Sequence, residues 1–162
     1  MSGMTVVSGR IENQLIMEGN SSHAIQLSFV FDLKTSSFNG ILRALNAQDV
    51  TIVALSFLEN CETTTVRCVV NYPDVARKVC LEQKIHCLEA KVLALELDSI
   101  SDLAKVSNIL FSAEIKIYYM YPFLMRPMGK VGLVVQTENN EFATNILSST
   151  GIQTLSQDNI AR

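Results

Sequence analysis

The sequence predicts an α+β fold made of two tandem β-α-β-β-α-β units, each an antiparallel sheet with its helices on one face. Segments with alternating apolar residues and segments with apolar residues at helical spacing follow each other in that order. The order is written twice along the 162 residues. Hydrophobic residues make up 48% of the chain and charged residues 18%, which is typical of a globular protein.

The first unit starts at Ala24, where AIQLSFVFDL alternates as a half-buried strand does. Helical spacing in FNGILRAL predicts a helix, with Ser36 or Ser37 as its N-cap. Two β-branched segments, VTIVALSFLE and TTTVRCVV, predict a pair of strands joined by a short turn. A second helix begins at Pro73, because proline is tolerated in a first helical turn. KIHCLEA is expected to close the unit as a strand.

The second unit repeats these elements in the same order. KVLALEL predicts a strand, and a helix with apolar residues at helical spacing follows DSIS. EIKIYYMYPF and KVGLVV predict the next two strands, joined through LMRPMG. The segment NNEFATNILSST predicts a helix, and GIQTL predicts a last short strand.

A constant offset relates the two units. Phe38 matches Leu103 and Val66 matches Val131, both 65 residues later. From Asp74 onward the offset becomes 67, so a single two-residue insertion separates the copies. We therefore expect an N-terminal extension over 1–23, a first domain over 24–90 and a second over 91–162, both ferredoxin-like.

Charge and residue content argue against several function classes. The net charge is −3, and the third strands of both units lack the aromatic residues of an RNA-binding sheet, so we expect no nucleic-acid partner. The four cysteines and two histidines are not clustered, and no catalytic set or phosphate loop is present, so we expect no metal, no cofactor and no enzymatic activity. No segment resembles a membrane span or a secretory signal, so we expect a cytoplasmic protein.

The aromatic segment YYMYPF lies at the end of the second strand of the second unit. In this plan the second strand is an edge strand, and Tyr and Met at an edge suit contact with a partner. Tyr118, Tyr119, Met120 and Tyr121 are therefore candidate interface residues, either between the two units or between two chains. Packing within the hairpin alone is the alternative.

With both units in place, residues 24–160 resemble tandem ACT-domain proteins. The segments VTIVALSFLENCETTTVRCVVNYPDVARKV and, more closely, AEIKIYYMYPFLMRPMGKVGLVVQTEN carry the resemblance. The second is similar to small stand-alone ACT proteins labelled as regulatory subunits of acetolactate synthase. The resemblance implies a regulatory module that binds amino acids rather than an enzyme.

The resemblance also places the ligand at the loop between the first strand and first helix of each unit. In this chain the loops read LKTSSFNG and DSISDL, without the Pro-Gly pair that is usual in the family. Serine and threonine hydroxyls and a helix N-terminus suit a carboxylate, and an aspartate suits an ammonium group. The candidate ligand-binding residues are Asp32, Lys34, Thr35, Ser36, Ser37, Phe38 and Asn39 in the first unit, and Asp98, Ser99, Ile100 and Ser101 in the second.

We therefore expect a non-enzymatic sensor of a small amino acid that acts on a biosynthetic enzyme and forms a homodimer. The alternative is an oligomerisation or protein-interaction module that binds no ligand, which the missing Pro-Gly pair favours.

Overall fold

The computed structural model describes residues 23–32 and 37–161. Its elements follow the predicted order except that two expected strands are one, β4, and that η1 and α5 were not predicted. All the paired strands are antiparallel and form one sheet of seven strands in the order β2-β3-β1-β4-β6-β5, with β7 beside β4. The expected N-terminal extension lies outside the described residues, apart from residue 23. The strands and helices of the first half are β1 Ala24–Asp32, α1 Ser37–Asn46, β2 Ile52–Glu59, β3 Thr63–Val70 and α2 Pro73–Glu82. Those that follow are β4 Leu88–Leu97, α3 Asp102–Ser112, β5 Ile117–Pro122, the 3-10 turn η1 Pro127–Gly129, β6 Val131–Thr137, α4 Asn140–Ser149, β7 Gln153–Thr154 and α5 Gln157–Ile160.

Strand β4 joins the two halves and corrects one expectation. KIHCLEA and KVLALEL were expected as two strands, but Leu88–Leu97 is a single strand and Lys84 has a positive φ of 56°. No glycine, proline or other turn-forming residue interrupts LEAKVLALEL, so the chain has no reason to break there. Residues 88–92 of β4 pair with β1, and residues 93–97 pair with β6. The boundary expected between residues 90 and 91 therefore falls inside this strand.

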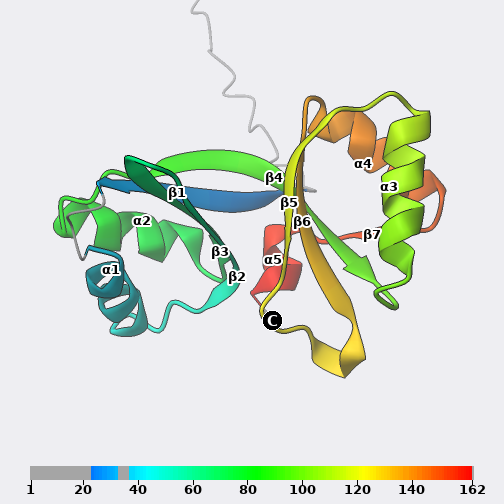
Figure 1. The fold of residues 1–162 in the computed structure, drawn as a ribbon. Coiled ribbons are helices and arrows are strands. Elements are labelled where there is room, and N and C mark those ends of the chain that lie inside the picture. The colour runs from blue at the N-terminus through cyan, green and yellow to red at the C-terminus, as the bar shows by residue number, and fades with distance from the viewer. Residues whose placement is uncertain (1–22, 33–36, 162) are drawn as a thin grey trace, which may run out of the picture.

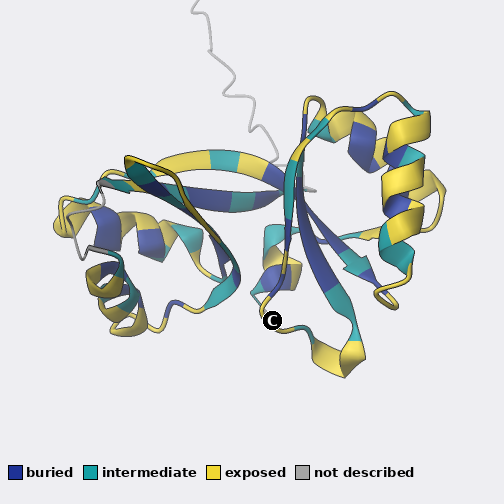
Figure 2. Cartoon of the chain, viewed as in Figure 1, coloured by how far each residue is buried: buried dark blue, intermediate teal, exposed yellow. Residues whose placement is uncertain are grey.

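Each half buries its own core between the sheet and two helices. In the first half the strand residues Leu27 and Phe29 pack with Ile41 of α1 and Val79 of α2. In the second half strands β4 and β6 pack against α3 and α4 in the same way. Figure 1 shows the helix pairs on the outer sides of the molecule, and Figure 2 shows that their exposed residues face away from the sheet. The predicted arrangement of helices on one face of each antiparallel unit is confirmed.

A third core lies between the halves, on the sheet face without these helices. Its buried residues come from both halves and from the C-terminal segment: Ala24, Ala54, Val69, Val92, Ala94, Tyr121, Phe123, Val134, Leu155 and Ile160. The sheet curls so that β2 meets the chain after β5, where Ala54 pairs with Phe123 and the Leu124 N–H donates to the Val53 carbonyl over 2.8 Å. We call this region the seam.

Helix α5 closes the seam near the start of β1, and the sequence analysis did not anticipate it. Figure 1 shows it between the two halves. The carboxamide oxygen of Gln157 accepts from the Ile25 N–H at 3.0 Å, and its nitrogen donates to the Val70 carbonyl at 2.8 Å. One side chain thus satisfies backbone groups of β1 and β3 that would otherwise need another partner.

Candidate functional site

The predicted site of the first half lies mostly where the structure makes no description. Lys34, Thr35 and Ser36 fall outside the described residues. Asp32 is the last residue of β1 and Ser37 the first of α1, so the backbone leads into and out of the loop as predicted. The ring of Phe38 packs on Phe57, with centroids 5.9 Å apart. Asn39 is exposed on α1.

The predicted site of the second half is the turn from β4 into α3. The Ser99 N–H donates to a carboxylate oxygen of Asp102 at 3.1 Å, and the hydroxyls of Ser99 and Ser101 lie 2.5 Å apart. Ser101 precedes the helix, but its side chain makes no capping hydrogen bond. Ile100 is 70% exposed. The turn is therefore ordered by its own polar side chains.

Beside this turn lies a polar cavity of about 210 Å³. The lining residues come from the end of β4, the first turns of α3 and the segment into β7: Glu96, Leu97, Asp98, Asp102, Lys105, Gly151, Ile152 and Gln153. The structure thus brings the predicted Asp98 to the cavity, whereas Ser99, Ile100 and Ser101 are exposed and do not line it.

Both signs of charge meet at this cavity. Asp98 forms an ion pair with Lys130, and that hydrogen bond, with the positive charge behind it, lowers the pKa of the Asp98 carboxyl. The same pair raises the pKa of Lys130. Glu96 is held by Arg126 over 2.6 Å in a largely buried ion pair. Lys105 donates to the Thr150 carbonyl at 3.3 Å, so its ammonium group reaches across from α3 to the end of α4.

Glu96, Asp102 and Lys105 were not among the site residues predicted from the sequence. A signal for two of them was present, because Asp102 and Lys105 are three residues apart at a helix start and so lie on one face. The predicted topology also places the last strand of each unit beside its first. This explains why the residues before β7 reach Glu96, which pairs with Gln153.

The candidate interface residues divide between the two faces of β5. Tyr119 and Tyr121 point into the seam, where the Tyr121 hydroxyl donates to the buried Gln26 carboxamide at 2.8 Å and Gln26 donates to the Tyr119 hydroxyl at 2.8 Å. The Arg67 guanidinium of β3 lies 4.3 Å from the Tyr119 ring centroid. Met120 packs in the core of the second half, and Tyr118 is 56% exposed.

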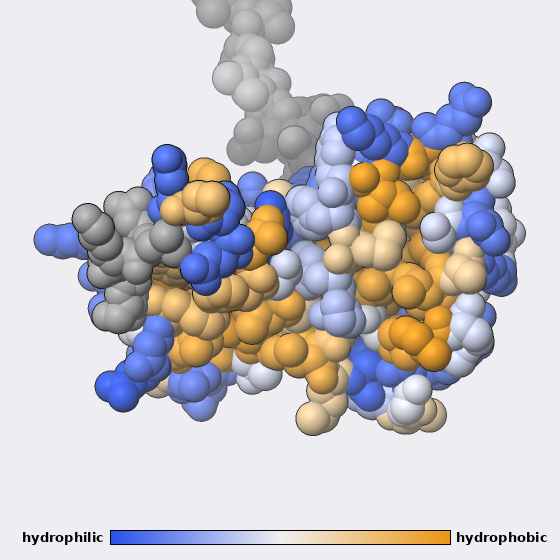
Figure 3. Space-filling model, in the orientation of Figure 1, coloured by the Kyte–Doolittle hydropathy of each residue, from blue (hydrophilic) through white to orange (hydrophobic). Residues whose placement is uncertain are grey.

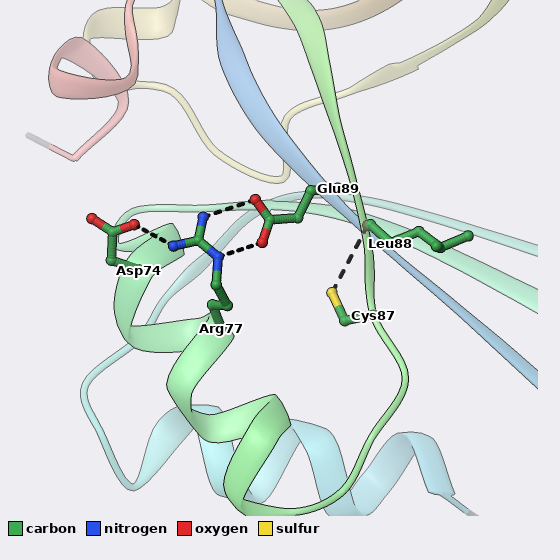
Figure 4. A network of polar contacts seen from close by, with 5 residues as sticks. All are labelled: Asp74, Arg77, Cys87, Leu88 and Glu89. Atoms are coloured by element: carbon green, nitrogen blue, oxygen red, sulfur yellow. Dashed lines mark hydrogen bonds and ion pairs between the residues drawn. The ribbon is translucent and has the colours of Figure 1, made fainter. Parts of the chain in front are cut away.

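A second polar cluster is structural. Arg77 of α2 donates to both carboxylate oxygens of Glu89 on β4, at 2.5 and 2.8 Å, and to Asp74 at 2.8 Å (Figure 4). The thiol of Cys87 turns to the Leu88 carbonyl at 3.8 Å (Figure 4). The bidentate ion pair between Arg77 and Glu89 fixes α2 to β4, the strand that joins the halves.

An ammonium group and carboxylates line the polar cavity from different elements, which is the charge arrangement that a small zwitterion requires. No group of three His, Cys, Asp or Glu side chains suited to a metal occurs within residues 23–32 and 37–161. In that same part of the chain no helix is long and apolar enough to cross a bilayer.

Comparison with known proteins gives one family and several structural neighbours. A family model described as an ACT domain pair matches residues 23–162. No curated protein sequence matches the chain. The crystal structure of the protein BT0572 from Bacteroides thetaiotaomicron is similar with a TM-score of 0.80 at 21% identity, over 89% of this chain and 99% of that one. The ligand-free regulatory subunit of aspartate kinase from Thermus thermophilus is similar with a TM-score of 0.53 at 10% identity, over 78% of this chain and 91% of that one.

Proposed function

The chain belongs to the ACT domain pair family, and on that premise we propose that it is a non-enzymatic regulatory protein that senses a small amino acid. The observation that carries the proposal is the cavity beside the turn from β4 into α3, where Asp98 and Lys105 offer charges of opposite sign. An amino acid requires charges of both signs, because its ammonium group binds a carboxylate and its carboxylate binds a cation.

The amino acid would bind with its carboxylate on Lys105 and with its ammonium group on Asp98. The ion pair with Lys130 lowers the pKa of the Asp98 carboxyl below its usual value, so Asp98 is charged at neutral pH and can accept from the ammonium group. The cavity of about 210 Å³ suits a small ligand rather than a large cofactor.

The second half is the stronger candidate for the ligand. The offset of 65 residues places Gly40 of the first half where the second has Lys105, and Phe31 where it has Glu96. The same offset places Leu33 where the second half has Asp98 and Ser37 where it has Asp102, so the first half lacks the cation and the carboxylates of this cavity. The proposed stoichiometry is one amino acid per chain at the β4–α3 turn.

The regulated target in this proposal is an amino-acid biosynthetic enzyme, on which the chain acts as a homodimer. Amino-acid binding would shift that interaction only if the ligand prefers one arrangement of the two halves. A link to acetolactate synthase rests on the resemblance of one segment and stays a prediction.

A thermal-shift titration tests the proposal. The melting temperature of the purified protein is measured in the presence of increasing concentrations of each of the twenty amino acids. A ligand that binds the native state raises the melting temperature by mass action. We expect one amino acid, or one chemical group of them, to do so. The Lys105→Met variant should weaken its binding about tenfold or more, since a charge-assisted hydrogen bond is worth about 1.5–3 kcal/mol.

The matched control is Lys78→Met, which removes an exposed lysine from α2 in the other half and should leave the affinity unchanged. If no amino acid shifts the melting temperature, the chain is an interaction module without a ligand. If binding occurs but Lys105→Met and Lys78→Met behave alike, the sensor function stands and the cavity is wrongly assigned.

A further inference from the structure

A second cavity lies at the seam, away from the polar one. Its volume is about 290 Å³, and both halves and the C-terminal segment contribute to it. Its walls are mostly apolar side chains, formed by Ile52, Val53, Leu124, Met125, Pro127 and Ile160. Figure 3 shows apolar residues on both halves of this face, and they reach the junction between the halves in the lower part of the view.

The cavity exists because the pairing between the halves stops early. The chain after β5 pairs with β2 at one bridge, Ala54 to Phe123, and at the bond from the Leu124 N–H to the Val53 carbonyl. At the same point a bulge between Ile52 and Ala54 shifts the register between β2 and β3. The segment after β5 then turns into η1 instead of continuing alongside β2, which leaves a space between this segment and β2.

Two side chains bring hydrogen-bond donors to this cavity. Arg126 donates through Nε to Glu96 at 2.6 Å and through Nη1 only weakly to the Asn159 carbonyl at 3.5 Å. A guanidinium has five N–H groups, and no further hydrogen bond of Arg126 occurs among the described residues, although its guanidinium also lies 6.0 Å from the Phe123 ring centroid. The carboxamide oxygen of Asn71 accepts from the N–H groups of Thr51 and Tyr72, both at 2.9 Å, which leaves its NH₂ group as a donor.

We propose that the seam cavity is a second ligand site, which takes a small carboxylate with an apolar tail. The carboxylate accepts hydrogen bonds from Arg126 and Asn71, and the tail lies against the apolar walls. Within residues 23–32 and 37–161 no Asp or Glu side chain lines this cavity, so a ligand ammonium group finds no carboxylate among them. The site therefore prefers a plain carboxylate to the zwitterion proposed for the other cavity.

The two sites share an ion pair. Arg126 lines the seam cavity, and its partner Glu96 lines the polar cavity. A carboxylate that binds Arg126 competes with Glu96. A released Glu96 adds a second carboxylate, beside Asp98, for the ammonium group of the amino acid in the polar cavity. This step rests on the proposed amino-acid site, and it predicts that either ligand tightens the binding of the other, because coupling is reciprocal.

Binding of 3-methylbutanoate, read from amide chemical shifts, tests the seam site. The neutral probe 3-methylbutan-1-ol has the same carbon skeleton without the carboxylate. We expect the acid to shift the amides of residues 51–53, 71 and 124–126, and to bind at least tenfold more tightly than the alcohol. Equal binding of the two probes, shifts elsewhere, or no shift at millimolar acid would overturn the proposal.

Variants separate this inference from the proposed function. Arg126→Met leaves Glu96 unpaired and can destabilise the fold. The double variant Arg126→Met with Glu96→Met serves as its companion, because replacing both members of a buried ion pair is often tolerated. The single and the double variant should both lose the preference for the acid over the alcohol, and a folded double variant that keeps this preference would refute the role of Arg126. Lys105→Met should leave acid binding unchanged. If the protein binds an amino acid but not 3-methylbutanoate, the seam site is refuted and the sensor function stands. If it binds 3-methylbutanoate but no amino acid, the sensor function is refuted and the seam site stands.

Discussion

At the scale of residues, the charged side chains divide into those that face a cavity and those that fix the fold. Asp98 was a candidate because the resemblance to ACT-domain proteins places the ligand at this loop and a carboxylate suits an ammonium group. Lys105 was missed because an exposed lysine on a helix usually faces solvent, and only the approach of the segment before β7 turns it into a cavity residue. Gln26 was missed for a related reason. Its burial depends on two tyrosines more than ninety residues away, which no local pattern reveals.

The Arg77–Glu89 pair gives a pH dependence of known sign. The hydrogen bonds from Arg77 lower the pKa of the Glu89 carboxyl below its ordinary value of 4.5. A carboxyl with a lower pKa in the folded state stabilises the fold above its unfolded pKa, and this contribution is lost as the pH falls through the folded pKa.

We therefore expect Glu89→Gln to destabilise the protein at pH 7 and to have no effect in acid below the folded pKa of Glu89. Both side chains are partly exposed, so the difference at pH 7 should be about 0–1 kcal/mol. Urea unfolding of both proteins between pH 2 and pH 7 measures it. A difference that grows toward low pH would contradict the assigned role of Arg77.

At the scale of elements, periodicity was sufficient for the helices and for most strands, because each has one apolar face. It failed where tertiary contacts decide. Strand β4 runs through an expected boundary, since both its parts have partners in one continuous sheet. Helix α5 is only four residues long, too short for a periodic signal, and a serine–asparagine capping box and the buried Ile160 hold it in place.

Strand β6 depends on a glycine at its contact with the seam. A Cβ added to Gly132 would lie 2.3 Å from Cγ of Phe123, whose N–H donates to the Gly132 carbonyl at 2.9 Å. We expect Gly132→Ala to cost about 1–3 kcal/mol, as overpacking of a core does. Combining it with Phe123→Ala should cost less than the sum of the two single variants.

Thermal and urea unfolding measure these costs, with Gly40→Ala as the matched control. Gly40 lies in α1 with no atom within 4 Å of an added Cβ, so that change should be neutral or stabilising by up to about 1 kcal/mol. Equal effects at the two glycines would show that the Phe123 contact does not limit the strand.

At the scale of the whole molecule, the repeat predicted the two halves, but their arrangement had to come from the structure. Two β-α-β-β-α-β units can pair edges within one chain or between chains, and the sequence favours neither. Within this chain, the seam brings Tyr119 and Tyr121 of β5 to Gln26 of β1. The seam also explains how a bond between Arg126 and Glu96 can connect two cavities.

The central claim is that an amino acid binds beside the turn from β4 into α3. The most direct measurement is a two-dimensional NMR titration of the ¹⁵N-labelled protein with pools of the twenty amino acids. The account predicts that one of them shifts the amide signals of residues 96–105 and 151–153 together, with a stoichiometry of one per chain. Absence of any shift at millimolar concentration, or shifts confined to another part of the molecule, would contradict it.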